Sequence, residues 1–253
     1  MKHGQAGPGL ARRGGARGLW PTLIIQQTKG KTEMRKYEIV LTGKTPLLMH
    51  NDNVEWSDNM DEWRLNPENK KMSKAGDDRT PPWLWLGYCY HDGEYLCVPQ
   101  ANIMRCLMEA GAMLTVPGKG KKTFKAQTQS GMMSIDSNWP LFVFGKPILF
   151  KEFYEMAKTE KFTDQKESIQ NYGASLFVKR AVIKTSKHVR VRPKFDNWVL
   201  KGSIAVWDEQ IDEDTLRTIF QFAGQYKGLC DWRPGGKTPG PYGMFDAEVI
   251  TEK

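Results

Sequence analysis

A glycine- and proline-rich segment near the C-terminal end most constrains what this chain can fold into. Residues 224–246 hold six glycines and three prolines, mixed with basic and aromatic side chains. A capped helix is expected directly before the segment, at 212–222, and a strand directly after it, at 244–251. Because ordered elements flank the segment on both sides, we expect a structured loop and not a flexible linker. Glycine lets such a loop approach a ligand closely or adopt positive φ.

The side chains of this loop indicate nucleic acid as a ligand. Basic residues supply contacts to phosphates, and aromatic residues supply faces on which bases stack. The loop residues expected to take part are Lys227, Trp232, Arg233, Lys237 and Tyr242. The alternative is an irregular surface loop in which Trp232 only braces the backbone. We interpret the segment as a nucleic-acid-binding loop.

The charge of the chain is unevenly distributed. The formal net charge is +8 over 253 residues, and residues 1–33 contribute +5 of it. The remaining 220 residues, enough to bury a sizeable core, carry only +3. Any electrostatic footprint of this body must therefore be local.

Residues 1–33 differ from the rest in composition. They hold seven glycines and no periodic apolar pattern, and we interpret them as a disordered tail before a domain at 34–253. No apolar run has the length that a signal peptide or a membrane span needs. The four cysteines form no CxxC pair, and the four histidines complete no zinc pattern with them. We therefore expect free thiols, a cytoplasmic protein, and no metal or cofactor.

Periodicity and turn signals predict an α+β fold with an antiparallel sheet. Strands are expected at 37–43, 95–98, 139–150, 189–192, 198–207 and 244–251, with helices at 99–114 and 212–222. Three insertions, at about 51–80, 116–131 and 152–175, interrupt this pattern. Four tryptophans in apolar strands are expected in the core: Trp83, Trp85, Trp198 and Trp207.

Two stretches of the body contain no acidic residue. One lies between Glu167 and Asp196 and holds seven lysines or arginines, and the other lies between Glu109 and Asp136 and holds four. Basic side chains on one strand face, next to a lysine- and glycine-rich loop, form a track for a phosphate backbone. The alternative is a solvated edge strand that its lysines protect from pairing. The contacts expected here are Lys119, Lys121, Lys122, Lys125, Lys187, His188, Arg190 and Arg192.

Signals for catalysis are weak. The chain has no GxSxG, HExxH or P-loop signature, and no catalytic residue can be assigned. His50 is expected to be a structural hydrogen-bonding residue. The acidic residues of the first insertion are expected to form a solvated loop and not a magnesium site: Asp52, Asp58, Asp61, Asp77 and Asp78.

Three features, in this order along the chain, resemble the RAMP superfamily. The first strand ends in Gly43-Lys-Thr-Pro-Leu-Leu-Met-His50. Asp92-Gly-Glu-Tyr-Leu-Cys-Val-Pro99 then leads into a helix with apolar residues at regular spacing up to Ala110. Finally, the glycine-rich loop precedes the last strand. The chain is similar to the backbone subunit of CRISPR effector complexes, or to a phage or mobile-element relative of it.

The resemblance implies a modified RRM-like (ferredoxin-like) antiparallel sheet with helices on one face and insertions that act as thumb and fingers. Such subunits bind single-stranded RNA through its backbone and stack head to tail, which implies copies of this chain and other effector subunits as partners, and a role in antiviral defence. Carried over by position, the helix after Pro99 would face the nucleic acid near Gln100, Asn102 and Arg105. The serine-rich start of that helix in the CRISPR proteins is replaced here by Gln100-Ala-Asn102.

The sequence therefore predicts an oligomerising protein that binds single-stranded nucleic acid, RNA or DNA, without reading its sequence. Two other functions compete with this one. The first is an endoribonuclease on the same scaffold, since some backbone subunits cleave target RNA with an aspartate of the first insertion, a position that Asp52 or Asp58 can fill. The second is a phage or mobile-element assembly protein that binds no nucleic acid.

Overall fold

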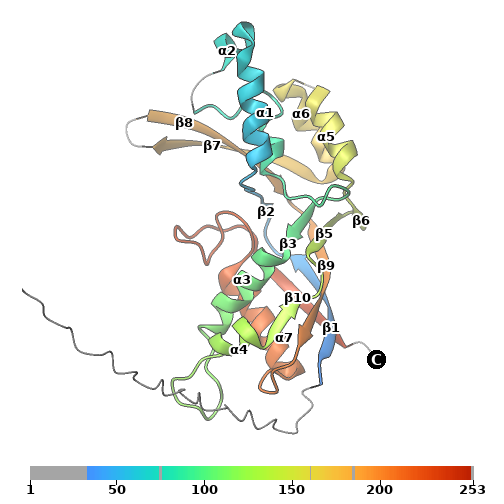
Figure 1. The fold of residues 1–253 in the computed structure, drawn as a ribbon, viewed down its shortest axis with the longest axis vertical. Helices are drawn as coiled ribbons and strands as arrows, with labels where there is room; N and C mark the ends of the chain where they lie inside the picture. The colour runs from blue at the N-terminus through green and yellow to red at the C-terminus, as the bar shows by residue number, and fades with distance from the viewer. Residues whose placement is uncertain (1–32, 74–75, 160, 184–185, 252–253) are drawn as a thin grey trace, which may run out of the picture. The chain divides into compact units, whose positions relative to one another are not determined.

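The computed structural model describes residues 33–73, 76–159, 161–183 and 186–251 (Figure 1). All of the tail expected at 1–33 except Glu33 lies outside these residues, as does Lys184 of the basic stretch. The described residues form a mixed α+β structure with two sheets whose named strands pair only in the antiparallel sense.

The larger sheet has seven strands within the described residues. Its central order is β10 (Phe245–Thr251), β1 (Arg35–Gly43), β9 (Trp198–Val206), β5 (Asn138–Val143) and β3 (Cys97–Pro99). Two short strands pair at its margins, β4 (Met132–Ser134) with β9 and β6 (Lys146–Pro147) with β5. In β1, alternate residues Tyr37, Ile39 and Leu41 are buried, which is the period-two pattern of a strand with one face on the core.

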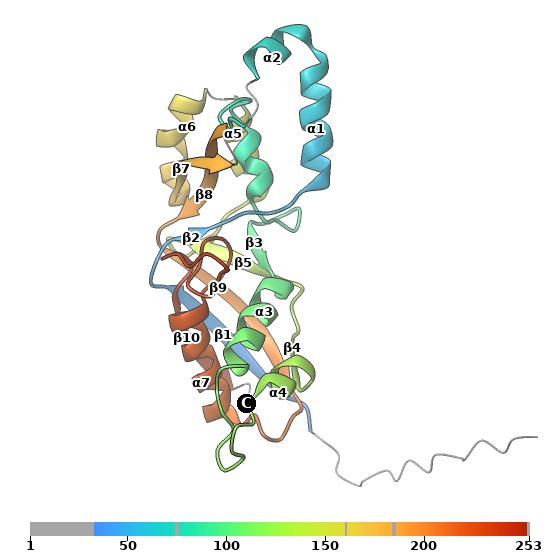
Figure 2. The same cartoon turned by 90° about the vertical axis from the view of Figure 1, so that its left-hand side faces the viewer.

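Two helices cover one face of this sheet, α3 (Gln100–Gly111) and α7 (Glu213–Phe222), and a short helix, α4 (Lys125–Ser130), packs beside α3 (Figure 2). In α3, Ile103, Leu107 and Ala110 are buried at helical spacing. The first turn of α7 is capped by Asp212, whose side chain accepts a hydrogen bond of 2.8 Å from the Thr215 backbone N–H. Both helices confirm the predictions from sequence.

The smaller sheet is built from β2 (Leu47–Leu48) and the long hairpin of β7 (Ala174–Ile183) and β8 (Ser186–Phe195). The helices of the first and third insertions lie around this hairpin in both views (Figures 1 and 2). They are α1 (Val54–Leu65), α2 (Pro67–Met72), α5 (Phe150–Thr159) and α6 (Phe162–Ser168). Three short helical turns complete the structure: η1 (Leu84–Tyr88), η2 (Ile169–Tyr172) and η3 (Ala223–Lys227).

The tryptophan predictions are only partly correct. Trp85 and Trp198 are fully buried, and each indole N–H has a partner: Gln165 Oε1 at 2.9 Å for Trp85, and the Thr45 carbonyl at 2.8 Å for Trp198. However, Trp85 lies in η1 and not in a strand, because the apolar run 83–90 folds into a short helical turn. Trp83 and Trp207 are only half-buried.

Candidate nucleic-acid interface

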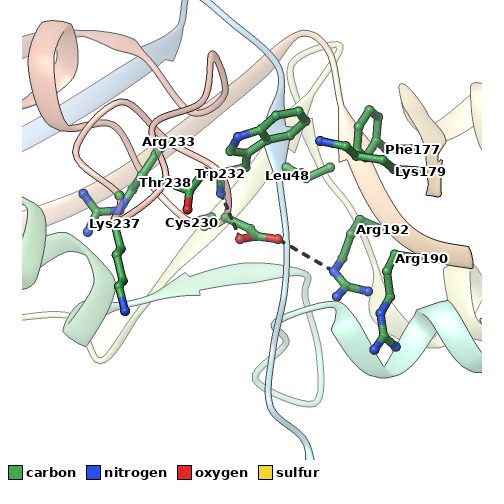
Figure 3. Close-up of a pocket in the computed structure, with 12 residues that line it drawn as sticks. Leu48, Phe177, Lys179, Arg190, Arg192, Cys230, Trp232, Arg233, Lys237 and Thr238 are labelled. Atoms are coloured by element: carbon green, nitrogen blue, oxygen red, sulfur yellow. Dashed lines mark hydrogen bonds and ion pairs between the residues drawn. The ribbon is translucent and has the colours of Figure 1, made fainter. Parts of the chain in front are cut away.

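A pocket of about 470 Å³ lies between the glycine-rich loop and the β7–β8 hairpin (Figure 3). Its size is that of a site for a small molecule or for one unit of a polymer. Five cationic side chains line it: Lys179, Arg190, Arg192, Arg233 and Lys237. Leu48, Phe177 and Trp232 supply apolar surface, and Asp231 supplies a carboxylate.

Backbone hydrogen bonds hold the glycine-rich loop in one conformation. The Leu229 N–H donates to the Gly243 carbonyl at 2.9 Å, and the Gly243 N–H donates to the Pro46 carbonyl at 2.8 Å. Gly243 has a φ of +71°, and a Cβ at this position would overlap the carbonyl oxygen of Leu229. The loop therefore needs glycine for its close backbone approach, and the prediction of a structured loop is confirmed.

An aromatic cluster joins this loop to the hairpin. The rings of Phe177 on β7 and of Trp232 and Tyr242 in the loop lie with centroids 5.5–5.8 Å apart. The Lys179 ammonium lies 3.6 Å from the centroid of the Trp232 ring (Figure 3). The Trp232 indole N–H also donates to the Pro239 carbonyl at 3.2 Å. Trp232 thus braces the loop, as one of the two sequence interpretations had it, and it also lines the pocket; base stacking stays a prediction.

Two arginines of β8 are anchored by a buried carboxylate. Asp78 is 4% exposed and accepts hydrogen bonds from Arg190 Nη1 at 3.0 Å and Arg192 Nη1 at 3.2 Å. The Val191 backbone N–H lies 3.3 Å from the same carboxylate. The solvated loop expected for the acids of the first insertion is wrong for Asp78, whose buried carboxylate is paired with charged donors of β8, and for Asp58 and Asp61, which are exposed on helix α1.

The same contacts change the role of Arg192. Its side chain is 11% exposed, and its guanidinium carbon lies 4.1 Å from the centroid of the Tyr88 ring. Its Nε lies 3.7 Å from Asp231 Oδ2 at the pocket wall. The basic strand face expected from sequence is therefore not a row of unpaired cations, since Asp78 partly neutralises both arginines.

His50 completes this network. Its Nε2 lies 3.2 Å from Arg192 Nη2, and its Nδ1 lies 3.6 Å from Asp231 Oδ2. Burial and then the charge of Arg192 lower the pKa of His50 below its usual value. A neutral ring accepts from Arg192 through Nε2 and directs its Nδ1–H toward Asp231, so the hydrogen-bonding role expected for His50 is confirmed.

Arg233 anchors the loop to α3. Its two terminal nitrogens lie 2.8 and 3.0 Å from the carboxylate oxygens of Glu109, and Arg105 Nε lies 2.8 Å from Glu109 Oε1. Burial by itself raises the pKa of Glu109, but the hydrogen bonds from Arg233 and Arg105 outweigh it and hold the pKa below its usual value. The bidentate geometry fixes the loop relative to the helix.

A second pocket of about 140 Å³, called the small pocket below, adjoins the pocket of about 470 Å³, called the large pocket. The two share Cys230, Asp231 and Arg233, and the small pocket is also lined by His50, Tyr90, Asn102 and Arg105. Two of the three helix residues singled out by the family resemblance therefore lie beside the glycine-rich loop. The third, Gln100, is half-buried and lines neither pocket.

The lysine-rich loop lies elsewhere. Lys119 and Lys122 line a separate pocket of about 640 Å³ together with Glu209 and Asp212. In Figure 1 this loop follows the end of α3 that points away from the β7–β8 hairpin. The continuous track expected from the two acid-free stretches is therefore not formed, and this applies equally to the exposed Lys121 and Lys125.

Three further predicted contacts lie at the margins of the site. Lys187 is exposed toward the tip of the hairpin, and His188 is half-buried beside Gly76. Lys227 is half-buried, and its carbonyl accepts from Arg233 Nη1 at 3.2 Å. None of the three lines the large or the small pocket.

Sequence reasoning missed Phe177 and Asp231 as site residues, and it counted Lys179 among the basic residues between Glu167 and Asp196 without assigning it a contact. Phe177 and Lys179 are two residues apart on one strand, so they share a face of the strand. This spacing of an aromatic and a basic residue could have indicated both as site residues. In the part of the chain that the structure describes, no group of three or more His, Cys, Asp or Glu side chains is arranged to hold a metal ion. Cys230 is a free thiol there, and burial raises its pKa to about 12.

Comparison with known proteins adds no relative. A scan against protein-family models finds no match, and a search of curated proteins finds no significant one. Across the described ranges, no helix has both the length and the apolar character that crossing a bilayer requires.

Proposed function

We propose that the large pocket binds single-stranded nucleic acid through its phosphates, with Trp232 as a stacking face. One observation carries this proposal: five cationic side chains and two aromatic rings from segments far apart in sequence converge on a pocket lined by a single carboxylate. A ligand that suits this lining is anionic, planar in part, and long enough to touch several cations. Single-stranded nucleic acid meets all three requirements.

The cations divide into two groups with different roles. Arg190, Arg192 and Arg233 are held by buried or half-buried carboxylates, so they form a fixed wall of N–H donors whose positive charge is partly neutralised. Lys237 is exposed and has no ion pair among the described residues, and Lys179 is held only by the ring of Trp232. We assign direct, salt-sensitive phosphate contacts to these two lysines. The Lys179 ammonium must leave the Trp232 ring for a base to stack there, at a cost of about 0.5–1 kcal/mol for an exposed cation–π contact.

The core topology supports the family resemblance and forms part of the proposal. Along the chain, helix α3 lies between β1 and β5 and helix α7 lies between β9 and β10, and the strand order is β10-β1-β9-β5. We propose that this order reflects a ferredoxin-like sheet, in which two strand–helix–strand units interleave. We propose that the chain is a RAMP-like protein in which α1–α2, α5–α6 and the β7–β8 hairpin are elaborations of that core.

Assembly along the strand is the second part of the proposal. Several large apolar side chains are exposed, including Val54 and Leu65 on α1, and Phe144 on the turn between β5 and β6. The Phe144 side chain is 70% exposed, and the residue also has a φ of +52°, which is unfavourable for a bulky side chain. We propose that these side chains contact neighbouring copies when nucleic acid is bound. Light scattering of the complex with strands of increasing length tests this, and one copy per strand at every length contradicts it.

Fluorescence anisotropy of the full chain with labelled single-stranded RNA and DNA of one sequence, over a salt series, tests the binding proposal. We expect the logarithm of affinity to fall linearly with the logarithm of salt, by about 0.7 for each phosphate contact. K237E should weaken binding and reduce this slope, whereas K146E, at an exposed position on β6, should leave both nearly unchanged. The basic tail is identical in all variants, so the difference between them isolates the pocket.

Two outcomes contradict the proposal: absence of binding at low salt, or equal effects of K237E and K146E. The same RNA, incubated with and without EDTA and run on a denaturing gel, distinguishes a binding protein from a ribonuclease. Intact RNA in both arms is expected from the proposed function.

A further inference from the structure

Asp231 is exceptional among the residues around the site. It lines both the large and the small pocket, and it is the only acidic residue of the described chain in either lining. Its side chain is 36% exposed, so a ligand can reach it. A carboxylate in a phosphate-binding site repels phosphates, so its presence there calls for a different ligand group.

The backbone around Asp231 is strained on both sides. Cys230 has a φ of +61° and Trp232 a φ of +44°, and Phe144 is the only other described non-glycine residue with positive φ. This loop uses glycine elsewhere, so the two left-handed residues beside Asp231 are conspicuous. Strain of this kind persists only where surrounding contacts fix the conformation, and it concentrates at functional sites.

Those contacts fix the direction of the carboxylate. The Asp231 backbone N–H donates to the Leu48 carbonyl at 2.9 Å, and Asp231 Oδ1 accepts from the Trp232 N–H at 2.9 Å. Oδ2 lies 3.6 Å from His50 Nδ1 and 3.7 Å from Arg192 Nε, both longer than a good hydrogen bond. Each carboxylate oxygen has two lone pairs, so Oδ2 keeps the capacity to accept a hydrogen bond from a ligand.

The two pockets differ in the part of a nucleotide that they fit. The Trp232 ring lines the large pocket, where a base can stack, and does not line the small one. The small pocket has less than a third of the volume and is lined by polar groups, including Asn102 and Arg105. A sugar attached to the stacked base fits beside it. In a single strand, the donor on the sugar is the 2′-hydroxyl, which DNA lacks.

We infer that Asp231 accepts a hydrogen bond from a ribose 2′-hydroxyl and thereby makes the site selective for RNA over DNA. This inference rests on the proposed function and deepens it. A hydrogen bond to a charged acceptor, lost in DNA, corresponds to roughly a 10-fold or greater difference in affinity.

The test measures the affinity of the full chain for RNA, for DNA containing uracil, and for 2′-O-methyl RNA of one sequence at one salt concentration. The wild type should bind RNA at least about 10-fold more tightly than either of the other strands. D231A should bring the three affinities together, and D231N, which keeps an acceptor oxygen, should retain part of the preference. D246N, which changes an exposed acid on β10, should retain all of it.

A second control separates selectivity from damage to the arginine network. D78N disturbs Arg190 and Arg192 from the buried side, so it should change the affinities for RNA and DNA by the same factor. Equal wild-type binding to RNA and DNA, or an RNA preference that survives in D231A, overturns the inference while leaving the proposed function intact. If D231A instead changes the preference among homopolymers, Asp231 reads a base edge, and the inference is also wrong. Absence of binding to all three strands rejects the proposed function itself.

Discussion

Replacing Asp78 by asparagine tests whether the buried ion pairs hold the site together. The substitution keeps the shape of the side chain but removes the charge that faces Arg190 and Arg192 at 3.0 and 3.2 Å. The Arg192 side chain is only 11% exposed, so its charge then loses its closest carboxylate in a place that water hardly reaches. Removing one partner of a buried pair costs about 3–5 kcal/mol. Because Asp231 stays 3.7 Å from Arg192, we expect the lower end, about 3 kcal/mol.

Urea denaturation of the wild type and D78N measures this loss as a lower midpoint with an unchanged slope. The matched control is D61N, which removes an exposed ion pair with Arg64 at 3.4 Å and should cost at most about 0.5 kcal/mol. A double-mutant cycle of D78N with R192M should show a coupling energy of about 1 kcal/mol or more. If D78N costs no more than D61N, the pairs do not stabilise the site, and the reasoning from burial is wrong.

Three further predictions follow from the loop and its neighbours. In urea denaturation, G243A should lower the free energy of unfolding by more than about 1 kcal/mol, and it should weaken RNA binding. The control is G93A: Gly93 also has positive φ, but no atom lies near its Cβ position, so this substitution should leave RNA binding unchanged. W232A should weaken binding to RNA and DNA alike by roughly 5- to 100-fold in anisotropy titrations, and W232F should restore most of it; equal losses in both variants contradict a stacking role. The folded-state pKa of His50 is lowered from about 6.5, so the unfolded chain takes up the proton first. Stability should therefore fall as pH drops below about 6.5, and H50Q should show a shallower fall over this window, while a parallel profile contradicts the assignment.

The elements that the sequence predicts correctly are those with a complete local signal. In α3 and α7, apolar residues recur at helical spacing, and Asp212 marks a start. In β1 and β10, short strand-like runs bounded by turn residues were enough to predict the strands. The tight turn of η1 escaped prediction because an apolar run of that length has no period that separates a strand from a buried helical turn.

The site could be predicted only where its residues are neighbours in the chain. Trp232, Arg233 and Lys237 were identified because the loop itself carries their signal. The ion pair between Asp78 and Arg190 joins residues 112 positions apart, and no local sequence pattern indicates it. The separation of the lysine-rich loop from the basic hairpin could not be predicted either. It depends on the direction in which α3 runs, and counting charges along the sequence gives no information on that direction.

Photo-crosslinking followed by mass spectrometry tests the central claim most directly. A single-stranded RNA that carries 4-thiouridine would be bound to the full chain and irradiated, and the attached peptides would be identified. The proposed site predicts crosslinks on Trp232, Tyr242 or Phe177, and their loss when unlabelled RNA competes. Crosslinks confined to the lysine-rich loop at 116–124, or to residues 1–33, would contradict the assignment of the pocket between the glycine-rich loop and the β7–β8 hairpin.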